Sequence, residues 1–326
     1  MTAWPSRPEL AAALRRARSR APAADPRLRA VVVVPARDEH ARIERCLRAL
    51  SHQRGVRCGH FEVIVVLDGC VDDTAAIVAR CAAARAHPRI LTIELADSHG
   101  VGVARRLGMD LACERLLALG RSEGLIASTD ADSVVAHDWL ACQLRLARAG
   151  ARAIGGRIEL LAQERGSLAS ETLHAREHAR ERRMRELHAA GEPHAALEHH
   201  QFSGASLAIT ADTYRRCGGL PVRAALEDEA LERELRARGV PIHRSTSVRV
   251  RTSARTDGRA PRGLAWDLAG ADWRARCSYA AEQFPLELLL ARKRETIGLV
   301  LPAREVAATI GPIFEQALRL REAGLL

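Results

Sequence analysis

The stretch Gly124-Leu125-Ile126-Ala127-Ser128-Thr129-Asp130-Ala131-Asp132-Ser133 joins a short apolar run to two carboxylates one residue apart. The apolar run has the length of a buried β-strand. Side chains at positions i and i+2 share one face of an extended backbone, and open α/β sheets bind ligands beyond the carboxyl ends of their strands. We therefore expect Asp130 and Asp132 to converge at a ligand-binding sheet edge.

Two carboxylates held close together repel each other unless a positive charge lies between them. A divalent metal that carries a diphosphate supplies such a charge, and oxygen ligands suit Mg²⁺ or Mn²⁺. The pattern therefore makes Asp130 and Asp132 candidate metal ligands. The competing interpretation is a solvated loop with two chance acids, and the neighbouring motifs have to decide between them.

Apolar runs at 30–35, 61–67 and 90–95 precede this strand, and each is followed by a segment with helical spacing of apolar residues. The run at 30–35 is rich in β-branched residues, as strands buried on both faces of a parallel sheet are. The alternation predicts an α/β fold, a Rossmann-like doubly wound, mostly parallel sheet with helices on both faces.

The second half of the chain continues with strands and helices in a less regular order. We expect strands at 153–161, 202–209 and 240–251, and helices at 167–189 and 226–238.

Composition limits the class of protein. Hydrophobic residues make up 47% of the 326, which is enough for a sizeable core. No apolar run is long enough for a transmembrane segment, and the first thirty residues lack a signal-peptide core. The eight cysteines form no Cys-x-x-Cys pair, which indicates reduced thiols and a cytoplasmic protein.

The formal charge of +10 invites a nucleic-acid interpretation. Lys293 is the only lysine, however, and the arginines are mixed with acids instead of forming one basic block. Aromatic residues, which stack on single strands, are only 3% of the chain. We therefore expect no nucleic-acid partner, and the positive balance suits an anionic small substrate.

Several motifs occur in order along the chain, each after an expected strand or loop, and together they resemble the family-2 glycosyltransferases with a GT-A fold. The motifs are Val-Pro-Ala-Arg-Asp-Glu at 34–39, Asp-Gly-Cys-Val-Asp-Asp-Thr at 68–74, Gly-Val-Ala-Arg-Arg-Leu-Gly at 102–108, Thr-Asp-Ala-Asp at 129–132, Phe-Ser-Gly-Ala-Ser at 202–206, Gly-Gly-Leu-Pro at 218–221 and Leu-Glu-Asp-Glu at 226–229. The resemblance covers residues 30–262 and implies that one sugar moves from a nucleotide-sugar donor to an acceptor hydroxyl.

The resemblance also implies which residues hold the nucleoside and the diphosphate. Glu39 and Asp68 would accept hydrogen bonds from base and ribose, with a backbone group near Pro35 adding another. Arg105 would reach the base or the diphosphate, since a guanidinium matches phosphate geometry.

The same resemblance implies how the metal would be held. Asp130 would contact both the ribose and the metal, and Asp132 would ligate Mg²⁺ or Mn²⁺ directly. The metal would neutralise the departing nucleoside diphosphate, which is Lewis-acid catalysis.

On the acceptor side, Asp228, preceded by Glu227, lies where the family places its general base, and Glu227 is a candidate substrate-binding residue. A base there would take the acceptor proton during an in-line attack that inverts the anomeric configuration. The alternative is that these acids only charge a helix N-terminus. Arg255 and Arg259 could close over the diphosphate, or they could be exposed arginines in an arginine-rich chain.

Two departures from the family pattern matter. The segment 248–252 lacks the histidine that many relatives use as a further metal ligand, and His243 lies too early to replace it. The chain also lacks the Gln-x-x-Arg-Trp motif of processive synthases, so we expect a non-processive enzyme. The donor base, the sugar and the acceptor cannot be read from the sequence, and a homodimer is possible.

The expected domain organisation has three parts. Residues 1–29 form a lead that is poorly ordered or helical; residues 30–262 form the GT-A domain, with a nucleotide-binding half (30–135) and an acceptor half (136–262). Residues 263–326 form a helical extension. Its segment 300–305 reads like 33–38, which suggests a truncated second copy of the first β-α unit, or else an ordinary terminal strand and helix.

Two other functions compete with sugar transfer. The first is a catalytically silent relative that uses the pocket to bind nucleotides. The second is an NAD(P)-dependent oxidoreductase, because Gly100-Val101-Gly102 follows a strand and opens a helix. Arg105 occupies the place of the third glycine, which counts against the second alternative.

Overall fold

The protein is described by a computed structural model that covers residues 7–84, 88–165, 170–191, 196–223 and 226–256, together with positions 264, 265 and 268. The expectations for the C-terminal extension, including the truncated repeat, fall almost entirely outside the described residues, and so does Arg259.

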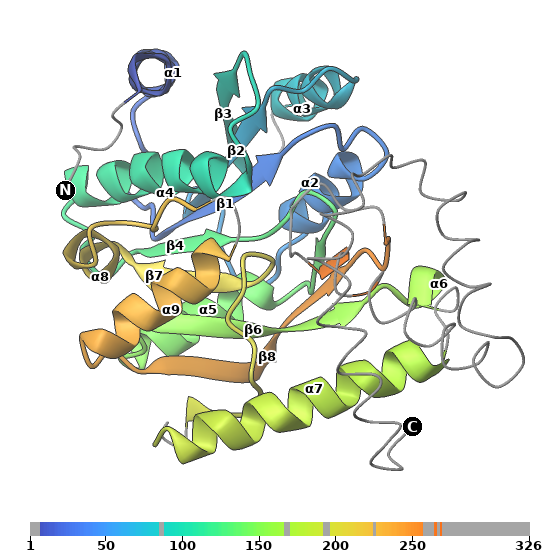
Figure 1. The fold of residues 1–326 in the computed structure, drawn as a ribbon. Coiled ribbons are helices and arrows are strands. Elements are labelled where there is room, and N and C mark those ends of the chain that lie inside the picture. The colour runs from blue at the N-terminus through green and yellow to red at the C-terminus, as the bar shows by residue number, and fades with distance from the viewer. Residues whose placement is uncertain are drawn as a thin grey trace, which may run out of the picture. The chain divides into compact units, whose positions relative to one another are not determined.

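The described residues form one eight-stranded sheet, drawn in Figure 1, with the strand order β3-β2-β1-β4-β7-β6-β8-β5. The strands are β1 (Ala30–Ala36), β2 (Phe61–Asp68), β3 (Arg89–Leu95), β4 (Leu125–Ser128), β5 (Val134–Val135), β6 (Ala153–Leu160), β7 (Leu207–Thr210) and β8 (Ile242–Thr252). The helices are α1 (Pro8–Arg20), α2 (Ile43–Ser51), α3 (Thr74–Ala83), α4 (Val101–Ala118), α5 (Trp139–Arg148), α6 (Ala162–Arg165), α7 (Ser170–Ala189), α8 (Ala211–Arg216) and α9 (Glu227–Ala237).

Strand β1 lies at the centre of the parallel half of the sheet, between β2 and β4. All seven of its residues are buried, as its β-branched composition predicts. Val31 and Val33 face the core on the side of α1, α4, α8 and α9, whereas Val32 and Val34 face the core on the side of α2, α3 and α5. The prediction of a mostly parallel sheet with helices on both faces is therefore confirmed.

The other half of the sheet is mixed. Strand β7 runs antiparallel to both β4 and β6, and β8 returns parallel to β6. The strand expected at 202–209 begins only at Leu207, because Ser203 and Ser206 form a turn in which the Ser206 amide donates to the Ser203 carbonyl at 2.8 Å. This turn places Gly204 beside the end of β4, since Leu207 pairs with Ser128.

Helix α1 takes up most of the first segment. Its residues Leu10, Ala13, Leu14 and Ala17 are buried at helical spacing, and the helix packs against β3. Residues 8–20 are thus helical, which is one of the two alternatives expected for the lead.

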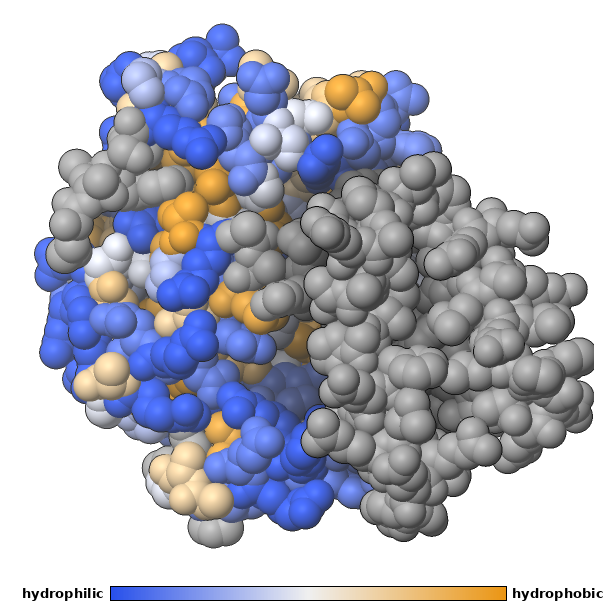
Figure 2. All heavy atoms as spheres, viewed as in Figure 1, coloured by the Kyte–Doolittle hydropathy of each residue, from blue (hydrophilic) through white to orange (hydrophobic). Residues whose placement is uncertain are grey.

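Among the described residues, the exposed large hydrophobic side chains are Val71 and Val222. On the face shown in Figure 2, hydrophilic residues predominate among those that are coloured. Among the described helices, none has both the length and the apolar character that crossing a bilayer requires.

Candidate functional site

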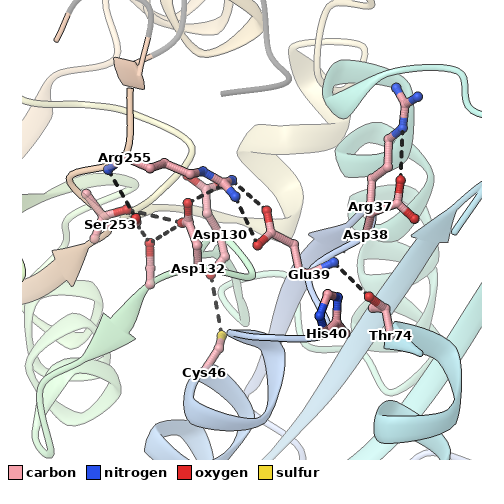
Figure 3. Close-up of polar contacts among 12 residues, drawn as sticks. Arg37, Asp38, Glu39, His40, Cys46, Thr74, Asp130, Asp132, Ser253 and Arg255 are labelled. Atoms are coloured by element: carbon pink, nitrogen blue, oxygen red, sulfur yellow. Dashed lines mark hydrogen bonds and ion pairs between the residues drawn. The ribbon is translucent and has the colours of Figure 1, made fainter. Parts of the chain in front are cut away.

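The candidate site lies at the carboxyl ends of β1 and β4. These strands are parallel neighbours, and Val33 pairs with Ser128, so the residues that follow each strand emerge at the same edge. Glu39 follows β1, whereas Asp130 and Asp132 follow β4. Figure 3 shows these acids on the same side of the sheet edge, as the sequence predicts.

Arg255, in the loop after β8, joins two of these acids. Its Nη2 lies 2.5 Å from Oε1 of Glu39 and 3.0 Å from Oδ2 of Asp132, and its Nη1 donates to Oε2 of Glu39 at 3.2 Å. The three side chains are mostly buried, with 16%, 7% and 13% of the Arg255, Glu39 and Asp132 side chains exposed. The guanidinium thus occupies the position of a cation between two carboxylates (Figure 3).

The other oxygen of Asp132 is held by hydroxyl groups. Thr252, the last residue of β8, donates to Oδ1 at 3.2 Å, and the Ser133 hydroxyl lies 3.3 Å from the same atom. The Ser133 hydroxyl also donates to Thr252 at 2.9 Å. These contacts orient the Asp132 carboxylate toward the edge that Arg255 crosses.

Arg105, in α4, neutralises the other acid of the pair. Its Nη2 donates to Oδ1 of Asp130 at 2.6 Å, its Nε donates to Ser128 at 3.1 Å, and its Nη1 pairs with Glu227. Only 3% of the Arg105 side chain is exposed. The guanidinium is enclosed by protein, so its expected contact with the donor stays a prediction.

Three neighbouring acids and one guanidinium affect the protonation of Asp130. Loss of hydration raises the pKa of Asp130 to about 6, and the charges of Asp132, Glu227 and Asp228 act in the same direction, while Arg105 opposes them. Although 35% of the Asp130 side chain is exposed, loss of hydration is the largest cause of the raised pKa, and the three neighbouring acids add to it. An added cation would be favoured at this edge.

Asp228 lies in the first turn of α9, on the same edge. Its Oδ2 accepts a hydrogen bond from the Gly204 amide at 3.0 Å, and its Oδ1 accepts one from the Glu229 amide at 2.9 Å. Leu226, which precedes the helix, has a φ of 59°, a left-handed conformation that non-glycine residues adopt mainly at constrained sites. The N-terminus of α9 also favours these carboxylates.

Gly204 connects the two halves of the site. A Cβ atom at this position would collide with the guanidinium of Arg105, so only glycine allows the turn to approach so closely. The same residue donates its amide to Asp228. The turn at 203–206 therefore positions Asp228 next to the arginine that binds Asp130.

Asp68 and Pro35 lie where the sequence predicts, at the ends of β2 and β1. Both oxygens of Asp68 are already engaged: Oδ1 accepts the His99 amide at 2.7 Å, and Oδ2 accepts the Ser98 hydroxyl and the Gly100 amide at 2.9 Å. In the structure Asp68 fixes the loop before α4. Its contact with a nucleoside, like that of Pro35, stays a prediction.

The donor set fits a divalent metal of the Mg²⁺ or Mn²⁺ type only in part. Asp130 and Asp132 offer hard oxygen ligands, but the described residues contain no group of three or more His, Cys, Asp or Glu side chains suited to a metal. Such metals often take a few carboxylates and complete their shell with substrate phosphates and water. The pair therefore fits a metal that arrives with a diphosphate.

The sequence interpretation missed several residues of this site. Ser128, Ser133 and Thr252 bind the acids or their arginine partner through hydroxyl groups, and Gly204 acts through its backbone. Gly204 lies in the Phe-Ser-Gly-Ala-Ser motif, and Ser128 and Ser133 lie in the stretch that carries the two acids, but neither pattern assigned these residues a role. Isolated hydroxyl residues give no sequence signal of their own.

Comparison with known proteins identifies the fold and the family. No curated protein sequence matches the chain. A mannosyltransferase from Pyrobaculum calidifontis, solved with GDP-Man and Mn²⁺, superimposes with a TM-score of 0.50 at 19% identity over 95% of this chain and 94% of its own. S. aureus TarS 1–349, solved with UDP, gives a TM-score of 0.50 at 15% identity over 80% of this chain and 76% of its own.

At these identities the two structures indicate a shared GT-A fold. The model of the family described as "Glycosyltransferase like family 2" matches residues 26–266, which include every strand and helix from β1 to β8. The chain therefore belongs to the family-2-like glycosyltransferases.

Proposed function

We propose that this protein transfers one sugar from a nucleotide-sugar donor to an acceptor hydroxyl, with inversion and without processive addition. The observation that carries the proposal is the bridge formed by Arg105, which binds Asp130 and Glu227 at once. This bridge supports a single site that contains the donor-side acids and, next to Glu227, the base candidate Asp228.

On the donor side, Asp130 and Asp132 would hold Mg²⁺ or Mn²⁺. Bound there, the metal would neutralise the charge that develops on the leaving nucleoside diphosphate. Arg255 lies beside Asp132, and its guanidinium would contact the diphosphate. The nucleotides in the two similar structures, GDP-Man and UDP, make GDP- and UDP-sugars the first donors to test.

On the acceptor side, Asp228 would act as the general base. The acceptor oxygen attacks the anomeric carbon, the bond from that carbon to the diphosphate oxygen breaks, and the acceptor proton moves to the Asp228 carboxylate. The Gly204 amide holds Oδ2 of this carboxylate, which fixes its direction before the acceptor binds. Attack opposite the leaving group inverts the anomeric configuration.

A donor screen tests the proposal. Release of nucleoside diphosphate would be measured for UDP- and GDP-sugars with Mn²⁺ and with Mg²⁺, using wild type, Asp228→Asn and the control Glu229→Gln, an exposed acid on the same helix. We expect Asp228→Asn to lower kcat by roughly 10²–10⁴-fold while donor binding persists. Full activity in Asp228→Asn would contradict the assigned base, and binding without turnover in wild type would favour the silent relative.

A further inference from the structure

Arg255 occupies the place where a bound cation would be needed. It comes from a loop 216 residues away from Glu39 in sequence, yet it binds both Glu39 and Asp132. Because Asp132 is also the expected metal ligand, the guanidinium and the metal cannot use Oδ2 of Asp132 independently.

We propose that Arg255 and the divalent cation compete for Asp132, so that the metal binds tightly only together with a nucleoside diphosphate. The inference rests on the proposed function and adds that the metal and the diphosphate bind together. The diphosphate gives Arg255 a second anionic partner, and Asp132 then becomes available to the metal.

The charges around Asp132 support this competition. Glu39, Asp132 and Arg255 together carry one net negative charge, whereas Asp130 is already paired with Arg105. Metal that displaces Arg255 from Asp132 without a diphosphate leaves the mostly buried guanidinium with Glu39 as its carboxylate partner and close to a dication, which is unfavourable.

The hydrogen bonds around Asp132 support it as well. Oδ1 accepts a hydrogen bond from the Thr252 hydroxyl, and Oδ2 is paired with Arg255. A metal ligand at Oδ2 therefore requires the guanidinium to move. A diphosphate offers that guanidinium two parallel charge-assisted hydrogen bonds.

Coupling of this kind is reciprocal: if the nucleotide strengthens metal binding, the metal strengthens nucleotide binding by the same factor. Couplings between two ligands typically amount to about 5–150-fold. Replacing Arg255 by a neutral residue removes the competitor, so it should strengthen binding of metal alone and reduce the coupling.

The test is a titration of the protein with Mn²⁺, without nucleotide and with UDP or GDP. Electron paramagnetic resonance measures the concentration of the free ion at each step. The variants are Arg255→Gln, Arg255→Lys, which keeps the charge, and the control Arg251→Gln. Arg251 carries the same charge, is 65% exposed and lies beside Glu159 instead of Asp132. Circular dichroism checks that each variant is folded.

We expect Arg255→Gln to bind Mn²⁺ alone about tenfold more tightly than wild type, with a coupling factor to the nucleotide close to one. Arg255→Lys and Arg251→Gln should stay near wild type. Equal or weaker Mn²⁺ binding by folded Arg255→Gln would overturn the competition, even if the donor screen shows sugar transfer. Absence of nucleotide binding in every variant would instead remove the proposed function, and the competition with it.

Discussion

Two arginines neutralise the two acids that follow β4, and they do so in different ways. Arg105 lies in the long helix α4 and is 3% exposed, whereas Arg255 lies in a loop after β8 and is 16% exposed. Arg105 binds Asp130, Ser128 and Glu227. Arg255 binds Asp132 together with Glu39.

The difference separates a fixed charge from an exchangeable one. Removing Arg105 from its acids would leave Asp130 and the buried Glu227 uncompensated, which is costly. Arg255 is carried by a loop and is the more exposed of the two, so in our proposal a diphosphate would replace one of its acid partners. One arginine joins the acids of the site, and the other is the one that we propose responds to ligand binding.

The largest expected effect comes from removing the fixed arginine. Arg105→Gln should lower the free energy of unfolding by about 3–5 kcal/mol, the usual cost of breaking a buried ion pair. Arg255→Gln should lower it less, by about 1–3 kcal/mol, because Arg255 is itself the more exposed guanidinium, at 16% against 3% for Arg105. Urea denaturation of both variants measures their free energies of unfolding. Equal losses would contradict the distinction between a fixed and an exchangeable arginine.

A smaller effect is expected from neutralising Asp132, one of the two acids that Arg255 binds. Asp132→Asn should lower kcat for sugar transfer by about 100-fold or more, because the metal that would neutralise the leaving diphosphate loses a carboxylate ligand. Asp73→Asn, an exposed acid at the start of α3, is the matched control. Steady-state release of nucleoside diphosphate gives both rates, and similar kcat values would exclude Asp132 from the donor site.

The smallest expected effect concerns the hydroxyl that orients Asp132. Thr252→Val preserves the shape of a buried side chain but removes the hydrogen bond to Asp132, worth about 1 kcal/mol, and the acceptor of the Ser133 hydroxyl, so the donor KM should rise about fivefold. Thr246→Val, on the same strand but bound to Glu198, should leave KM unchanged. An unchanged KM in Thr252→Val would show that Asp132 needs no such support.

The strands and the two acids could be predicted because their signals are local. The β-branched run of β1 and the apolar run before Asp130 are patterns of adjacent residues, and strand periodicity acts over the same distance. The family motifs gave Asp228 its expected place at the start of a helix. These features depend little on what the rest of the chain does.

The partners of the acids could not be predicted in the same way. Arg105 pairs with Glu227 across 122 residues, and Arg255 pairs with Glu39 across 216. Asp68 binds the loop at 98–100 because of how that loop folds back. Such pairings arise only when the sheet brings distant segments together, so no local sequence pattern predicts them.

The most direct test is a crystal structure of the protein with Mn²⁺ and a nucleoside diphosphate, using anomalous scattering to locate the metal. The account predicts a manganese peak bonded to Asp132, with the diphosphate beside it, Arg255 turned onto the phosphates and Asp228 facing the same space. Manganese bound elsewhere, or a nucleotide held away from Asp228, would contradict it.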